Sequence, residues 1–193
     1  ISPSPELGDD GRPVNLGVRF RSTADGRIRG IRFWKRAGIT GTHTGSLWTS
    51  SGTRLAEASF SQETAGGWQV AMFPEPIAIS ANTTYIASYF CPAGNYARQP
   101  GYFNPASGTG TYSANPPLTA PADGLYGPNG LFAYADAPTF PTQSASSSNY
   151  WVDVLFESNT GSGTTQPPPG NTPVQGTTTY TLPVIPFSQP DIT

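Results

Sequence analysis

Hydrophobic and polar residues alternate along much of the chain with the two-residue period of β-strands. Leu16, Val18 and Phe20 lie at alternate positions, and Arg19 and Arg21 lie between them. Successive side chains of a strand point to opposite faces, so this pattern predicts a half-buried strand with its arginines in water. No stretch shows a sustained helical period, and the sequence therefore predicts an all-β fold.

The next apolar segment, from Arg27 to Arg36, changes phase at a glycine. Ile28 lies at an even position, whereas Ile31 and Phe33 lie at odd positions, and Gly30 stands between them. A β-bulge adds one residue to a strand and turns the later side chains over. We therefore predict a bulge at Gly30, with a positive φ at the glycine, that restores one continuous buried face.

Two further strand signals follow in the first half of the chain. Residues 45–49 and 53–60 flank Ser50-Ser51-Gly52 and predict a hairpin closed by a glycine-containing turn. After it comes a strand in which Trp68, Val70 and Met72 share one face. We expect Pro74 and Pro76 to end that strand, because proline cannot donate to a β-ladder.

The rest of the chain holds a central strand, a loop-rich region and a last strand, in that order. Residues 82–91 are apolar on both faces, which is typical of a central strand covered on both sides. Residues 92–148 are rich in Gly, Pro, Asn and Ser and predict long packed loops with a few short strands. Residues 150–157 alternate again and predict the strand that closes the globular unit.

This pattern divides the chain into four segments. Residues 1–13 form an extended N-terminal arm and residues 14–157 an antiparallel β-sandwich domain. Residues 158–176 are a Gly/Ser/Thr/Pro linker, and residues 177–193 an extended Pro/Thr-rich docking segment.

The docking segment is too apolar for a solvated tail. Its prolines, Pro183 and Pro186, exclude a central strand but suit a strand docked at a sheet edge or a polyproline segment. We expect it to bind its own domain or a neighbouring copy by strand addition. The predicted assembly residues are its large apolar side chains, namely Tyr180, Leu182, Val184, Ile185 and Phe187.

Composition narrows the choice of partners. The formal net charge is −2 and charged residues make up 11% of the chain, so we expect no nucleic-acid partner. No run of 18 apolar residues occurs, so we expect no membrane insertion. The single cysteine, Cys91, lies in an apolar run and is predicted to be a small buried hydrophobe. Because the chain begins at Ile1 without a signal segment, the sequence indicates either the mature form of an exported protein or a cut fragment, and we favour export.

Several blocks in one order resemble a bacterial family known only as a domain of unknown function. They are Leu16-Gly17-Val18-Arg19-Phe20, Gly30-Ile31-Arg32-Phe33-Trp34-Lys35, His43-Thr44-Gly45-Ser46-Leu47-Trp48, Gly67-Trp68-Gln69 and Thr84-Tyr85-Ile86-Ala87-Ser88-Tyr89. The resemblance spans residues 14–157. It implies a jelly-roll-like sandwich and an extracellular or cell-surface setting, often within repeats. It supplies no established catalytic residues.

The residues themselves give little support for catalysis, so we expect no enzyme and no cofactor. His43 is the only histidine, lies between two threonines and accompanies no G-x-S-x-G motif, which favours a structural role. Asp153 and Glu157 share a strand face roughly 13 Å apart, beyond the usual separation for glycoside hydrolysis.

No metal is expected either, although calcium is the harder one to dismiss. One histidine and one cysteine far apart exclude the usual zinc patterns. Asp9-Asp10-Gly11 and Asp123 offer oxygen ligands, but their spacing matches no calcium loop, and solvated loop carboxylates are the default interpretation.

The sequence favours two non-catalytic functions and ranks an enzyme third. The first is an extracellular structural or adhesive subunit whose partners are other copies of itself or adjacent modules. The alternative is a carbohydrate-binding module for a polysaccharide, with Trp34, Trp48 and Trp151 as its aromatic platform, because they lie opposite the predicted core. The competing interpretation of these tryptophans is that they cover a second layer or an edge.

Overall fold

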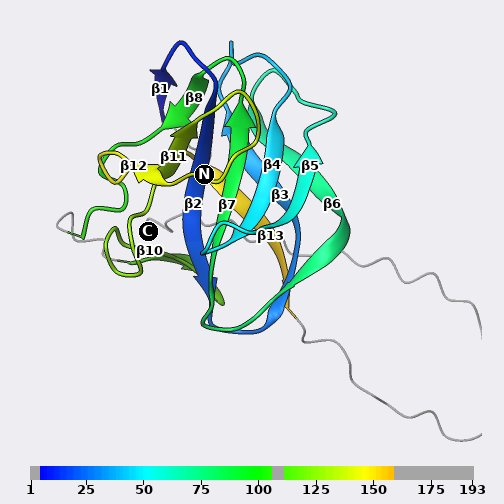
Figure 1. The fold of residues 1–193 in the computed structure, drawn as a ribbon, viewed down its shortest axis with the longest axis vertical. Coiled ribbons are helices and arrows are strands. Elements are labelled where there is room, and N and C mark those ends of the chain that lie inside the picture. The colour runs from blue at the N-terminus through cyan, green and yellow to red at the C-terminus, as the bar shows by residue number, and fades with distance from the viewer. Residues whose placement is uncertain (1–4, 106–110, 159–193) are drawn as a thin grey trace, which may run out of the picture.

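The computed structural model describes residues 5–105 and 111–158, which form antiparallel sheets and contain no α-helix (Figure 1). The strands are β1 (Glu6–Asp9), β2 (Val14–Ser22), β3 (Gly26–Lys35), β4 (Thr44–Thr49), β5 (Arg54–Ser59), β6 (Gly67–Ile79), β7 (Thr84–Cys91), β8 (Asn95–Arg98), β9 (Thr111–Asn115), β10 (Leu118–Pro121), β11 (Leu131–Tyr134), β12 (Gln143–Ser144) and β13 (Val152–Ser158). The predicted all-β, antiparallel class is confirmed. The predicted linker beyond Ser158 and the docking segment 177–193 lie outside the described residues.

The larger sheet has the order β12-β11-β2-β7-β4-β5, with β10 pairing both β2 and β9. β7 lies between β2 and β4 and is buried along nearly its whole length, which confirms the predicted central strand. β4 and β5 form the predicted hairpin. Gly52 supplies the positive φ of its turn, at 92°.

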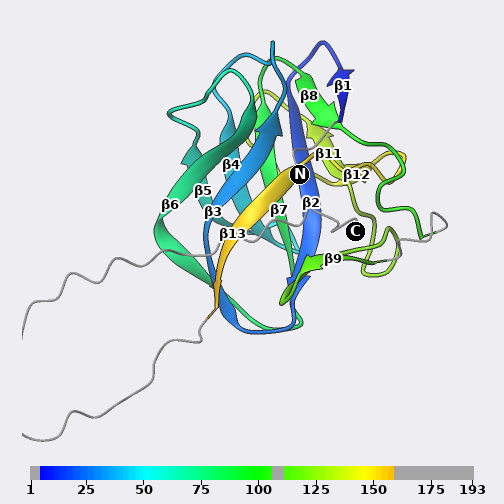
Figure 2. The same cartoon turned by 180° about the vertical axis from the view of Figure 1, so that it is seen from behind.

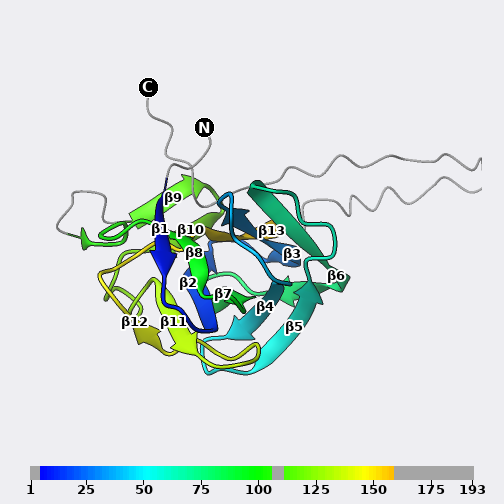
Figure 3. The same cartoon turned by 90° about the horizontal axis from the view of Figure 1, so that it is seen from above.

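The second sheet, of order β13-β3-β6, packs against the first and lies in front of it in Figure 2. The two layers are clearest from above (Figure 3). Between them lies one apolar core to which alternate residues of β2, β3, β7 and β13 contribute. Its fully buried members include Leu16, Val18, Phe20, Ile28, Ile31, Phe33, Leu47, Ala87 and Val154.

The predicted bulge in β3 is present, but its physical cause is different from the expected one. Leu155 pairs Gly30 and Phe156 pairs Ile28, so Arg29 is the extra residue. Gly30 does not have a positive φ. The glycine is required because a Cβ there would lie 2.3 Å from the Ala71 carbonyl oxygen of β6.

β6 does not end at its prolines. It continues through Pro74 and Pro76 to Ile79, with a register shift against β3 between Ile28 and Gly30. Its only ladder partner among the described strands is β3, so it is an edge strand, where proline is tolerated. The prediction that these prolines end the strand was therefore wrong.

The predicted N-terminal arm includes a strand of the folded unit. β1 pairs β8 along its four residues, from Glu6 opposite Arg98 to Asp9 opposite Asn95. Cys91 is buried, as predicted, and its thiol donates to the Asn95 carbonyl at 3.0 Å. Among residues 5–105 and 111–158, no helix is long and apolar enough to cross a membrane.

Candidate functional site

Trp48, one of the predicted platform residues, lies in a second small core. It is 5% exposed, and its indole N–H donates to the Ser88 hydroxyl at 2.8 Å. Ile86, Leu131 and Phe140 pack around it on the outer side of the larger sheet. Trp48 therefore covers a second layer, which was the competing interpretation.

The other two platform residues lie at the second sheet, Trp34 within β3 and Trp151 immediately before β13. Trp151 is buried and its ring packs edge-on against Tyr102. Trp34 is half-buried and its ring meets Trp68 edge-on, with centroids 5.6 Å apart. The three predicted tryptophans are thus divided between two sheets and do not form one exposed platform.

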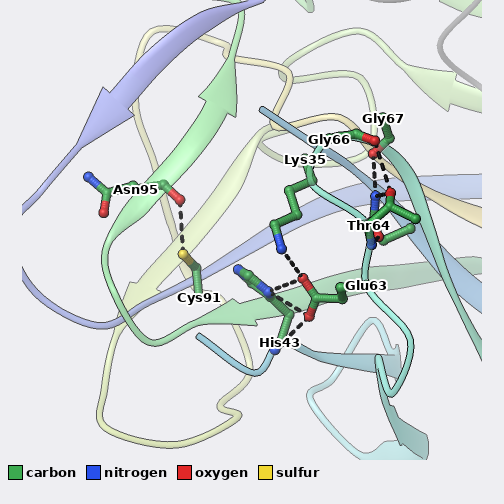
Figure 4. A network of polar contacts seen from close by, with 9 residues as sticks. Lys35, His43, Glu63, Thr64, Gly66, Gly67, Cys91 and Asn95 are labelled. Carbon is green, nitrogen blue, oxygen red and sulfur yellow. Dashed lines mark hydrogen bonds and ion pairs between the residues drawn. The ribbon is translucent and has the colours of Figure 1, made fainter. Parts of the chain in front are cut away.

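A buried group of polar side chains surrounds Glu63 (Figure 4). Lys35 donates to one Glu63 oxygen at 2.8 Å, and the His43 Nδ1 lies 2.8 Å from the other. The His43 backbone N–H also donates to Glu63, at 3.1 Å. Because a carboxylate only accepts, Nδ1 carries the proton in this arrangement.

This group is a closed structural network. The His43 ring is fully buried, its Nε2 has no hydrogen-bond partner, and it packs against Phe33 at 4.7 Å. Burial lowers the pKa of His43 despite Glu63 beside it. Burial alone would raise the pKa of Glu63, but hydrogen bonds from Lys35 and His43 lower it. A general base must reach its substrate, and this imidazole is enclosed by aromatic rings.

We expect the protein to lose stability as the pH falls below about 6.5, the pKa of an unfolded histidine. The folded-state pKa of His43 lies below its ordinary value, so the folded protein disfavours the added proton. The contribution of neutral His43 to the free energy of unfolding is complete above about pH 6.5. It is lost as the pH falls through the folded-state pKa of His43. Glu63 adds a further loss below its own unfolded pKa of about 4.3.

Urea unfolding at about pH 7.5 and about pH 5 measures this dependence. His43 is the only histidine in the chain, so His43→Gln should remove most of the change over that interval. Equal stability of the unaltered protein at both pH values would contradict the assignment.

The strand carboxylates considered for glycoside cleavage are both engaged by arginines. Asp153 is 1% exposed and accepts from Arg32 at 2.9 Å and 3.2 Å. Glu157 pairs with Arg29 at 3.1 Å. Each carboxylate therefore forms an ion pair that joins β13 to β3.

The loop carboxylates considered for calcium accept hydrogen bonds from protein groups. Asp10 accepts from the hydroxyls of Tyr96 and Tyr134 at 3.0 Å and 3.1 Å. Asp123 accepts from the Asn129 N–H and the Ser147 hydroxyl. Within the described part of the chain, no group of three His, Cys, Asp or Glu residues is arranged for a metal ion.

Asp123 and Asn129 instead fix a loop, residues 121–130, against β2. Asn129 is fully buried, accepts from the Arg19 N–H at 2.8 Å, and donates to the carbonyls of Arg19 and Pro121. Together with the hydrogen bonds that Asp123 accepts, these bonds attach the base of the loop to Arg19 of β2, to Pro121 and to Ser147. Arg19 and Arg21, predicted to lie in water, are half-buried beneath it.

The tip of this loop exposes two large apolar residues beside a pocket. Leu125 and Tyr126 are 56% and 48% exposed, and the Arg21 guanidinium lies 4.0 Å from the centre of the Tyr126 ring. The pocket has a volume of about 230 Å³, and its wall includes the polar residues Thr23, Asn82 and Thr119. Sequence reasoning missed this site, because the loop has no periodic pattern.

A second exposed apolar surface lies on β6. Val70 and Met72 are each 50% exposed and share the outer face of the strand with Trp68. Trp68 covers the Arg32 guanidinium at 3.9 Å. We call Trp34, Trp68, Val70 and Met72 the β6 face.

Most of the chain matches a known protein family. Residues 2–152 match the family described as Domain of unknown function (DUF4082). A search of curated proteins found no match.

Proposed function

We propose that this chain, which belongs to the DUF4082 family, is a non-catalytic structural or adhesive β-sandwich subunit that associates with neighbouring copies. Neither the family description nor the all-β fold assigns an activity, so the proposal rests on the surface of the domain. The observation that carries it is the exposed apolar row of the β6 face.

The β6 face has the character of an association surface. Val70 and Met72 retain half of their accessible area on an edge strand, next to the half-buried rings of Trp34 and Trp68. Contiguous exposed apolar side chains on a sheet mark sites of protein contact. Burying the exposed half of each of the two side chains contributes roughly 1 kcal/mol.

We assign the C-terminal segment of a neighbouring copy as the occupant of this face. β13, which ends at Ser158, belongs to the same sheet as β6, and the chain continues to residue 193. At about 3.3 Å per extended residue, the stretch from Ser158 to Tyr180 spans up to roughly 70 Å, enough to reach a neighbour. The predicted assembly residues, Tyr180, Leu182, Val184, Ile185 and Phe187, complement an apolar row.

An extracellular or cell-surface location is part of the proposal. Residues 158–176 are rich in Gly, Ser, Thr and Pro, a composition typical of spacers and stalks between modules. Saccharide binding is the alternative function, and a separate feature, the pocket beside Tyr126, supports it.

A double variant, Val70→Glu with Met72→Glu, should abolish association, because it places two charges on the apolar row. Sedimentation velocity of the full chain at several concentrations measures this. The matched control is Leu7→Glu, a residue equally exposed on β1, which should associate like the unaltered chain.

Deleting residues 159–193 should also leave a folded monomer, and the free peptide 177–193 should compete for assembly.

Two outcomes would contradict the proposal. One is an intact chain that stays monomeric at every concentration while the truncated domain loses stability, which would mean that the segment binds its own domain. The other is association that survives both charge substitutions on β6.

A further inference from the structure

The tip of loop 121–130 exposes apolar side chains on a rigid base. Asn129 and Asp123 fix that base through buried hydrogen bonds, and the Gly124 N–H closes the turn on the Gly127 carbonyl at 3.0 Å. Leu125 and Tyr126 nevertheless remain about half exposed. A loop fixed in this way presents its tip without an ordering cost on binding, which is the property of a preorganised site.

The charge of the adjoining pocket points to an anionic ligand. Arg21 is the only charged side chain among the described residues that line it. Its guanidinium donates to the Asn82 carbonyl and to the Thr84 hydroxyl, and it makes no ion pair within the described part of the chain. A guanidinium held in place with N–H donors to spare is suited to a carboxylate.

The size and the wall of the pocket point to a single sugar ring. Its volume of about 230 Å³ is below the range of about 300–1,000 Å³ typical of sites that enclose drug-sized ligands. Leu125 and Tyr126 are apolar residues of its wall, which suit the C–H face of a pyranose, and Thr23, Asn82 and Thr119 are polar residues of the same wall, which suit its hydroxyls.

We propose that this pocket binds one uronic acid unit of an acidic polysaccharide, with Arg21 on its carboxylate and Tyr126 against its ring. The site is independent of the proposed association surface. The residues of the pocket lie on β2, on β10, in loop 121–130 and in the turn between β6 and β7, whereas the β6 face lies on β3 and in the first half of β6. An acidic peptide is the competing ligand, but a pocket with room for one ring and one arginine favours the sugar.

Isothermal titration calorimetry of the full chain tests the proposal with a uronic acid trisaccharide and its neutral methyl ester. The acid should bind about tenfold more tightly than the ester, the difference expected when a hydrogen-bonded charge is removed. Tyr126→Ala and Arg21→Gln should each weaken binding of the acid by a similar factor. Raising the salt concentration should weaken it too.

The matched control is Arg12→Gln. Arg12 also stacks on a tyrosine, Tyr134 at 3.5 Å, but lies outside the pocket, so this variant should bind like the unaltered chain. Arg21 also supports Asn82 and Thr84, so Tyr126→Ala, a change at an exposed tip, provides the test if Arg21→Gln unfolds. Any one of four outcomes would overturn the proposal. The acid and the ester could bind equally, or the acid could fail to bind. Tyr126→Ala could bind the acid as tightly as the unaltered chain, or the chain could prefer a glutamate-rich peptide.

Discussion

Replacing Glu63 by alanine is expected to destabilise the domain by about 3–5 kcal/mol, the cost of leaving a buried charge without its partner. Glu63 and Lys35 each keep only 10% of their side-chain surface exposed, and their atoms lie 2.8 Å apart. Without the carboxylate, the Lys35 ammonium and the His43 Nδ1–H both lose their acceptor. Urea unfolding near neutral pH measures the loss.

Two further glutamate variants serve as comparisons for this prediction. Glu63→Gln keeps an oxygen acceptor for His43 but removes the charge that faces Lys35, so it should cost less than Glu63→Ala. Glu75→Ala removes an exposed glutamate and should change stability by no more than about 0.5 kcal/mol. If Glu63→Ala and Glu75→Ala have the same effect, the network does not stabilise the fold.

Truncating Phe33 to alanine is expected to cost a similar amount, about 3–5 kcal/mol. Phe33 is fully buried on β3 and stacks on Tyr89 of β7 at 4.4 Å, so it joins the two sheets. It also meets Phe60 edge-on at 4.8 Å. Removing the ring therefore opens a cavity between the layers and removes aromatic contacts at once.

Chemical denaturation measures this cost, and Tyr126→Ala is its control. Tyr126 is an aromatic residue of similar size but about half exposed, so its truncation should cost far less. A loss for Phe33→Ala below about 1 kcal/mol would mean that the core relaxes around the missing ring, and would contradict the close packing of the two sheets.

The sequence by itself determined where most strands lie and which of their side chains face the core. The alternation in β2 and β13, the phase change before Ile31 and the two apolar faces of β7 all correspond to the observed burial. A period of two is a local property of the extended backbone, so it can be read from consecutive residues. The bulge beside Gly30 was also detectable in the sequence, as the change of phase between Ile28 and Ile31.

Tertiary structure alone decided what covers each outer face and which polar groups meet. Loop residue Asn129 covers Arg19 from 110 positions away, and a segment containing Phe140 encloses Trp48. Glu63 reaches His43 across 20 positions and Lys35 across 28. Alternation shows that a side chain points away from the core but does not show whether water or another segment lies there. For this reason the structure does not contain the exposed platform of tryptophans that the sequence predicted. The exposure of Val70, Met72, Leu125 and Tyr126 could be recognised only in the tertiary structure.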